Sequence, residues 1–153
     1  MKTKFTIGIV SAVIAICAAV TFVFVHHHQQ VDFPKSSWAS AGHADPPSTL
    51  ATTLWDASKG DGEKLLVDLS PDMQDKLQQQ FGKQMEKQGI SLAQFLSQMG
   101  SRWAKGVNGF HIVSQEAISG DQMILHVQFQ GKKAEEKLKM KKIGGEWKLD
   151  DFS

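Results

Sequence analysis

Apolar residues recur every three or four positions from Ser48 to Trp103, and from Phe110 to the C-terminus they alternate with polar residues. The first spacing is typical of amphipathic helices, and the second of strands that bury one face. This order predicts an α+β fold, with N-terminal helices packed on a curved antiparallel sheet of about four strands. The domain is expected to span residues 48–153, long enough to bury a core of its own.

Four helices are predicted, each with its own start signal. Ser48 is expected to cap the first helix, which ends at Gly60 because glycine suits a left-handed C-terminal position. Asp61 caps the second helix, Ser70-Pro71 begins the third, and Ser91 caps the fourth. Their apolar faces are Leu50, Ala51, Leu54 and Trp55; Leu65, Leu66 and Leu69; Met73, Leu77, Phe81 and Met85; and Leu92, Phe95, Leu96, Met99 and Trp103.

The strands are predicted from their alternation and from two glycine turns. Residues 110–118 are rich in β-forming residues, and Met123, Leu125, Val127 and Phe129 alternate with polar neighbours. Leu138 and Met140 alternate with lysines, which are expected to form the solvent face of a third strand. Gly120-Asp121 and Gly144-Gly145 suit tight hairpin turns, the second leading into a strand with Trp147 and Leu149.

A different apolar pattern precedes this domain. Residues 5–25 contain no charged side chain and follow two lysines. As a helix they span roughly 30 Å, the thickness of a bilayer core, so residues 1–25 are predicted to form a transmembrane anchor with the domain outside the cytoplasm. Cleavage as a signal sequence and lipidation at Cys17 are the alternatives. The run is longer than a usual signal sequence, and bulky Ile16 precedes the cysteine.

Residues 26–47 lack apolar periodicity and contain three of the four prolines of the chain, which predicts a flexible linker. The linker begins with His26-His27-His28. Adjacent side chains point in different directions on a helix or a strand, so one metal ion cannot easily use all three. We interpret them as a polar boundary to the membrane.

Composition excludes some classes of function. The formal net charge is only +1, and a nucleic-acid binder needs a strong basic surplus. The single cysteine excludes an intramolecular disulfide. These features leave a membrane, a protein or a small molecule as the expected partner.

The acidic segment LWDASKGDGEKLLVDLSPDM, residues 54–73, is the strongest metal-site candidate. Placing Gly62 at the sixth position of a calcium loop puts Ala57 and Lys59 where oxygen ligands are required, so that register fails. Starting the loop at Asp56 fails as well, because an apolar valine takes the position of the last ligand. The acids are therefore expected to form an exposed capping corner between helices, with no metal.

No catalytic constellation is recognised. The chain has no tyrosine, and its sequence has no Ser/His/Asp order, metal-ligand spacing or phosphate loop. His126 is out of phase with the apolar set of its strand and is expected to face outward, as His111 is. Asp150 and Asp151 are interpreted as exposed C-terminal carboxylates. The protein is therefore predicted to be no enzyme and to use no cofactor.

The element order also resembles a known family. The phrases KGDGEKLLVDLSPD, IVSQEAISGDQMILHVQF and KMKKIGGEWKL, within about residues 48–152, are similar to the nuclear-transport-factor-like superfamily, also called the SnoaL-like or cystatin-like cone. The resemblance implies a sheet wrapped around helices to leave a cone-shaped cavity. Members of the superfamily include isomerases, dehydratases, cyclases, transport factors and extracytoplasmic modules.

Six aromatic residues are candidates for lining such a cavity, with ordinary core packing as the alternative: Trp55, Phe95, Trp103, Phe110, Phe129 and Trp147. The leading hypothesis is a non-catalytic module that binds a protein partner or a small apolar ligand. The module would be anchored in a bacterial cell membrane through residues 5–25. Its domain would face the periplasm in a diderm bacterium, and it would be secreted if the N-terminal segment were cleaved. Homo-oligomerisation stays open. The alternatives are an isomerase- or cyclase-like enzyme and a structural subunit of an envelope or secretion assembly.

Overall fold

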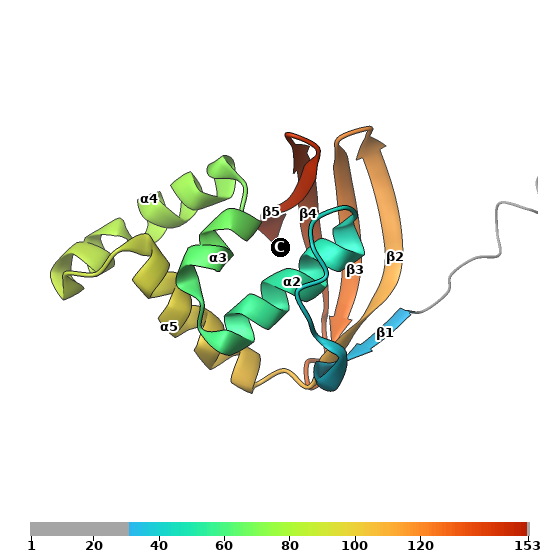
Figure 1. Cartoon of the computed structure of the whole chain (residues 1–153), viewed down its shortest axis with the longest axis horizontal. Coiled ribbons are helices and arrows are strands. Elements are labelled where there is room, and N and C mark those ends of the chain that lie inside the picture. The colour runs from blue at the N-terminus through green and yellow to red at the C-terminus, as the bar shows by residue number, and fades with distance from the viewer. Residues whose placement is uncertain (1–30, 153) are drawn as a thin grey trace, which may run out of the picture.

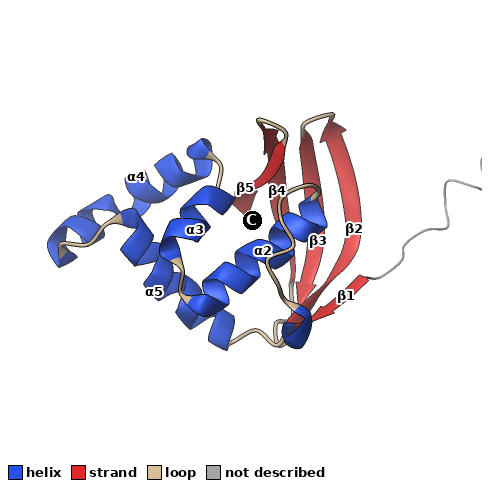
Figure 2. Cartoon of the chain, viewed as in Figure 1, coloured by secondary structure: helices blue, strands red, loops and turns tan. Residues whose placement is uncertain are grey.

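In the computed structural model, which describes residues 31–152, a five-stranded antiparallel sheet curls around one side of four α-helices (Figure 1). The elements are β1 (Val31–Pro34), the short 3-10 helix η1 (Lys35–Ser37), α2 (Pro46–Lys59), α3 (Gly62–Asp68), α4 (Pro71–Gln88), α5 (Leu92–Lys105), β2 (Gly109–Ser119), β3 (Gln122–Phe129), β4 (Glu135–Ile143) and β5 (Glu146–Phe152). Figure 2 shows α3, α4 and α5 grouped to the left of the strands, with α2 overlapping the sheet in this view. The predicted α+β class is confirmed.

The helix boundaries follow the capping residues closely. Gly60 ends α2 with φ of 70°, and the side chains of Asp61 and Ser70 accept hydrogen bonds from the first turns of α3 and α4. One boundary was predicted wrongly. Asp45, rather than Ser48, caps α2, because its carboxylate accepts from the backbone N–H of Ser48. The prolines at 46 and 47 therefore fill the first helical positions, where no N–H is needed.

The sheet is a meander in which each strand pairs with the next one along the chain. Leu125, Val127 and Phe129 are buried on its inner face, which confirms the alternation expected for β3. Register shifts interrupt β2 near Val113 and Ile118, and β4 against β5 near Lys139. Such bulges bend a strand and increase its twist, which accounts for the curl of the sheet.

A fifth strand was not predicted. Residues 26–47 were expected to be a flexible linker, but β1 pairs with β2, and the rings of Phe33 and Phe110 stack at 4.6 Å. Trp38 is only 3% exposed and packs against Phe110. The strand has four residues and ends at Pro34, too short to show a period in the sequence.

The predicted anchor, residues 1–25, and His26-His27-His28 lie outside the described residues. Within residues 31–152, none of the helices combines the length and the hydrophobicity that crossing a bilayer requires.

Two apolar clusters form the interior. The sheet-side cluster joins α2 to the inner face of the sheet and includes Leu50, Leu54, Phe110, Leu125, Phe129 and Trp147. The helix-side cluster joins α3, α4 and α5 and includes Ala57, Leu65, Met73, Leu77 and Leu96. Helix α2 contributes to both clusters, so it is the central element of the domain.

Candidate functional site: an apolar cavity between helices and sheet

An open cavity of about 620 Å³ lies where the two clusters meet. Cavities of roughly 300–1,000 Å³ are typical of small-molecule sites. All four α-helices contribute to its wall, together with β3, β4, β5 and the β3–β4 connection. The lining residues are mainly aliphatic: Leu50, Leu54, Leu65, Leu69, Leu77, Leu96, Leu138, Leu149, Met73 and Met99.

Regular helix spacing points these side chains inward. Leu50, Leu54 and Ala57 lie four and three residues apart on α2, and Met73 and Leu77 lie four apart on α4. Gly100 allows α5 to approach α2 and α3 closely. A Cβ added there would lie 3.0 Å from Leu65 Cδ1 and 3.2 Å from the Cβ of Ala57. The close packing of α5 against α2 and α3 beside the open volume therefore depends on a glycine at this position.

The polar part of the wall is concentrated on the β3–β4 connection and the first two residues of β4. Its charged lining residues are Lys132, Glu135 and Glu136, which lie beside exposed Ala134. The ammonium group of Lys132 pairs with Glu136 at 2.5 Å and lies 5.4 Å from the ring centres of both Trp103 and Phe129. This connection is the charged edge of an otherwise apolar cavity.

Two of the six predicted aromatic residues line the cavity. Trp103 and Phe129 meet edge to face, with ring centres 5.1 Å apart. The other four do not line it. Phe110 and Trp147 are buried in the sheet-side cluster, Phe95 packs against Phe81 at 5.0 Å, and half-buried Trp55 carries Lys59 over its ring. These four fit the alternative of core packing.

A buried acidic cluster, formed by His43, Asp56 and Asp68, was not anticipated. Nε2 of His43 lies 2.7 Å from Oδ1 of Asp68, within hydrogen-bond distance. Asp56 and Asp68 are 2% and 1% exposed, and one oxygen of each, Oδ1 of Asp56 and Oδ2 of Asp68, has no hydrogen-bond partner. A proton shared between the two carboxyl groups would satisfy both oxygens.

Burial explains the electrostatics of this cluster. It raises the pKa of Asp68 from 3.8 to about 6, although the hydrogen bond to His43 acts in the opposite direction. Burial also raises the pKa of Asp56, while Lys64 opposes the rise. The cluster joins the segment before α2 to α2 and α3, and none of its members lines the cavity.

The expectation of an exposed acidic corner is therefore correct for only part of residues 54–73. Asp61 caps α3 and Asp72 accepts a hydrogen bond from Lys141 on β4, and these hydrogen bonds lower the pKa of each carboxyl group. Asp56 and Asp68 are instead buried. Asp150 was also predicted wrongly as exposed: it is 8% exposed and accepts a hydrogen bond from Ser70.

A signal for the buried acids exists in the sequence of α2. Thr49, Thr52 and Asp56 recur at three and four residues, opposite a leucine face, and no charged residue precedes Asp56 in the helix. A helix without a strongly polar face is usually surrounded by protein. That pattern indicates a buried acid, whereas its proximity to other acids in the sequence suggested an exposed corner.

The histidines of the sheet lie apart from the cavity. His126 faces outward as predicted, with its Nδ1 2.6 Å from Glu135 and its Nε2 3.7 Å from Glu116. Across residues 31–152, no group of three or more His, Cys, Asp or Glu side chains is arranged to hold a metal ion.

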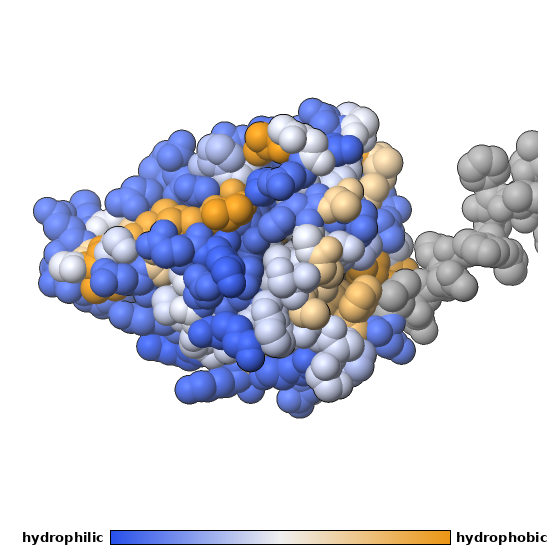
Figure 3. Space-filling model, viewed as in Figure 1, coloured by the Kyte–Doolittle hydropathy of each residue, from blue (hydrophilic) through white to orange (hydrophobic). Residues whose placement is uncertain are grey.

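Figure 3 shows a mostly hydrophilic face, with hydrophobic residues gathered in a stripe over the region of α4.

Comparison of the chain with protein-family models, with curated proteins and with solved structures found no match. The cavity and the acidic cluster are accordingly interpreted from their own geometry.

Proposed function

We propose that this protein is a ligand-binding module that holds a small apolar molecule in the cavity between its helices and its sheet. The observation that carries the proposal is the open volume of about 620 Å³ with a mainly apolar wall. Well-packed domains contain few voids larger than a water molecule, so a cavity of this size indicates a site for a ligand.

The architecture supports a place in the nuclear-transport-factor-like superfamily as part of the same proposal. Helices precede a meander in the chain, the sheet curls toward them, and a cavity lies between the two layers. These are the features that the resemblance implies for residues 48–152. A likeness of fold carries no particular ligand, so the ligand class has to be argued from the cavity wall.

The distribution of charge supports binding rather than catalysis. The ionisable side chains of the cavity wall lie on the β3–β4 connection (Lys132) and at the start of β4 (Glu135 and Glu136). Lys132 and Glu136 pair with each other, and Glu135 pairs with His126. An acid or base that acts on a bound substrate must reach it from the wall. The helical walls provide no such group, which favours a non-catalytic role over an isomerase- or cyclase-like one.

Residues 5–25 complete the proposal as a membrane anchor that holds the module outside the cytoplasm. Support comes from the sequence: an uncharged run long enough to cross a bilayer, preceded by lysines. A reporter fused after Ser153 should be active only in its exported form. Cytoplasmic activity of that reporter would overturn the topology without affecting the cavity.

The binding proposal is tested by recovering the ligand with the full-length protein. The chain is extracted from its own membrane with a polymer that keeps surrounding lipid, and small molecules that copurify are identified by mass spectrometry. Ala134→Trp places a large side chain at the exposed, charged edge of the cavity. Ala117→Trp makes the same change on β2, at an exposed position outside the lining.

A molecule retained by the wild type and Ala117→Trp, and depleted at least tenfold in Ala134→Trp, is expected. Carried-over lipid should be the same in all three samples, so the comparison separates it from a ligand. Equal recovery of every molecule from both variants would overturn the proposal, provided that their unfolding temperatures match that of the wild type.

A further inference from the structure

The cavity wall leaves little to bind a polar group deep inside. Its neutral polar side chains are the Thr53 hydroxyl and the Trp103 indole. The hydroxyl of Thr53 donates to the backbone oxygen of Thr49 at 2.9 Å, so its hydrogen is already used. The indole of Trp103 lies beside Lys132 at the charged edge of the cavity. A polar group of a ligand that is buried deeper, against α2 and α3, would therefore lose its hydrogen bonds to water without a new donor. The enclosed part of the ligand must be hydrocarbon.

The shape of that hydrocarbon follows from the side chains around it. Ten of the twenty lining residues are leucine or methionine, and such flexible side chains adapt to a flexible ligand. A flat ring system is usually held between aromatic faces. Here Trp103 and Phe129 pack edge to face on each other, and Lys132 lies over both rings, so they form no open slot for a third ring.

The charged residues of the cavity wall indicate where the polar end of the ligand would lie. The charged lining residues are Lys132 on the β3–β4 connection and Glu135 and Glu136 at the start of β4. Each has an exposed side-chain fraction between 29% and 40%. Phe152, which also lines the cavity, is half exposed. The α2 and α3 walls contribute Leu54 and Leu65, both at most 5% exposed, and no charged lining residue.

We propose that the ligand is a single-chain amphiphile, whose unbranched alkyl chain extends toward Leu54 and Leu65 while its polar end stays at the β3–β4 connection. The inference rests on the proposed function and narrows it to one ligand class. A free fatty acid and a lipid with one acyl chain share this chemistry.

Photolabelling of the full-length protein in its membrane tests the arrangement. Two twelve-carbon probes carry a diazirine, one at the end of the chain and the other next to the polar group. The first should label the peptides of α2 and α3 that contain Leu54 and Leu65. The second should label the peptide of the β3–β4 connection. Identical labelling patterns would overturn the proposed orientation.

The cavity variants establish that labelling takes place inside. Ala134→Trp should reduce labelling by both probes at least tenfold, and Ala117→Trp should leave it unchanged. Leu77→Phe, which narrows the cavity from α4, serves as a second variant if Ala134→Trp fails to fold. Unlabelled competitors of increasing chain length should gain about fourfold in affinity per methylene until the cavity is filled.

A rigid polycyclic competitor of similar volume separates the two proposals. If the polycyclic compound binds in the cavity and the alkyl chains do not, the ligand-binding proposal stands and the alkyl inference fails. If the cavity variants alter the binding of neither compound, both proposals fail. The expected result is competition by the alkyl chains alone.

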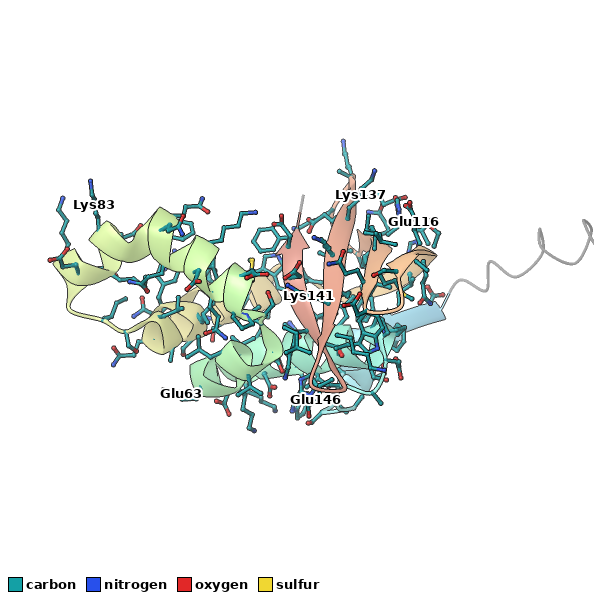
Figure 4. All side chains as sticks on the ribbon, turned by 90° about the horizontal axis from the view of Figure 1, so that it is seen from above. Glu63, Lys83, Glu116, Lys137, Lys141 and Glu146 are labelled. Atoms are coloured by element: carbon teal, nitrogen blue, oxygen red, sulfur yellow. The ribbon has the colours of Figure 1, made fainter. Side chains whose placement is uncertain are left out.

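The head-group position has its own test. Lys132→Gln removes the positively charged side chain of the cavity lining and leaves Glu136 unpaired, so a chain with a carboxylate head should bind about fivefold more weakly. A chain with a trimethylammonium head should not be weakened. Lys83→Gln removes a lysine at the far end of α4, away from the sheet, and should change neither (Figure 4). Equal affinities in Lys132→Gln and the wild type would overturn this placement.

Discussion

Helix α2 has two buried faces that are built in opposite ways. On one face, Thr49 donates to the backbone oxygen of Trp147, Thr52 accepts from the N–H of Ala41, and Asp56 reaches the acidic cluster. The other face presents leucines to a cavity of about 620 Å³. The first face is closed by directional hydrogen bonds, whereas the second borders open volume.

The difference shows how a small domain can keep an open volume. A cavity forfeits the packing contacts that its lining side chains would otherwise make. The hydrogen bonds of the polar face fix α2 to the segment before it and to β5. The position of the helix is therefore set by contacts away from the cavity, and the cavity wall does not need to close.

Removal of His43 should have the largest effect, because it leaves the buried carboxylate of Asp68 without its partner. Leaving a buried carboxylate without its partner costs about 3–5 kcal/mol. His43→Ala is expected to lower the free energy of unfolding by that amount at pH 7, measured by urea denaturation.

His126→Ala is the matched control for this experiment. The side chains of His43 and His126 are both 17% exposed, and each lies within hydrogen-bond distance of a carboxylate. The partners differ, because the side chain of Asp68 is 1% exposed and that of Glu135 is 40% exposed. His126→Ala should lower the free energy of unfolding by less than about 1 kcal/mol, because the pair that it breaks is exposed to solvent. Equal costs for the two variants would mean that the polar face does not hold α2.

The pH dependence of stability should be the next largest effect. Burial raises the pKa of Asp68 to about 6, so the folded state binds this proton more tightly than the unfolded state does. The resulting stability is complete below about pH 4 and is lost as the pH rises through about 6. His43, Asp56 and Lys148 act on this carboxyl group, and the pKa of Asp56 is raised in the same direction.

Asp68→Asn removes that proton site while keeping the shape of the side chain. The stability of the wild type relative to this variant should fall by at most about 3 kcal/mol between pH 4 and pH 7, measured by urea denaturation at several pH values. Asp61→Asn is a control of opposite sign, because hydrogen bonds lower the pKa of Asp61, and its contribution is lost as the pH falls below 3.8. A relative stability that rises with pH for Asp68 would contradict the assignment.

These two faces were unequally predictable from the sequence. The helices and strands follow from short-range signals: caps such as Ser70 and Ser91, the stop at Gly60, and the period of two in β3. Such signals depend on neighbours within a few residues, so they are readable from the chain. The leucines that face the cavity were likewise predicted as apolar faces.

What could not be predicted depends on residues far apart in the chain. Asp68 is buried because His43, 25 residues earlier, covers it, and β1 exists because β2 offers it a partner. Apolar periodicity also cannot distinguish a filled core from an open cavity, since both need the same inward faces. For that reason Trp103 and Phe129 line the cavity while Phe110 and Trp147 fill the sheet-side cluster.

Enlarging an aliphatic side chain should separate the cavity from the packed core. Leu77→Phe places extra volume in open space, so its free energy of unfolding should stay within about 1 kcal/mol of that of the wild type. Leu125 is completely buried in the sheet-side cluster, and overpacking there costs about 1–3 kcal/mol. Leu125→Phe should therefore be clearly less stable than Leu77→Phe in urea denaturation. Equal losses would mean that α4 cannot accommodate added volume and that the cavity is not open to a ligand.

The smallest effect is expected at the surface, where Lys76 of α4 pairs with Asp151 of β5 beside the cavity wall. The hydrogen bond from Lys76 lowers the pKa of Asp151, but both side chains are about half exposed and screened by solvent. Lys76→Ala should lower the free energy of unfolding by less than about 0.5 kcal/mol, and high salt should abolish the difference. A loss above about 1 kcal/mol would show that α4 is held by charge. The expected small loss would mean that α4 is held mainly by the packing of Met73 and Leu77, the residues through which it lines the cavity.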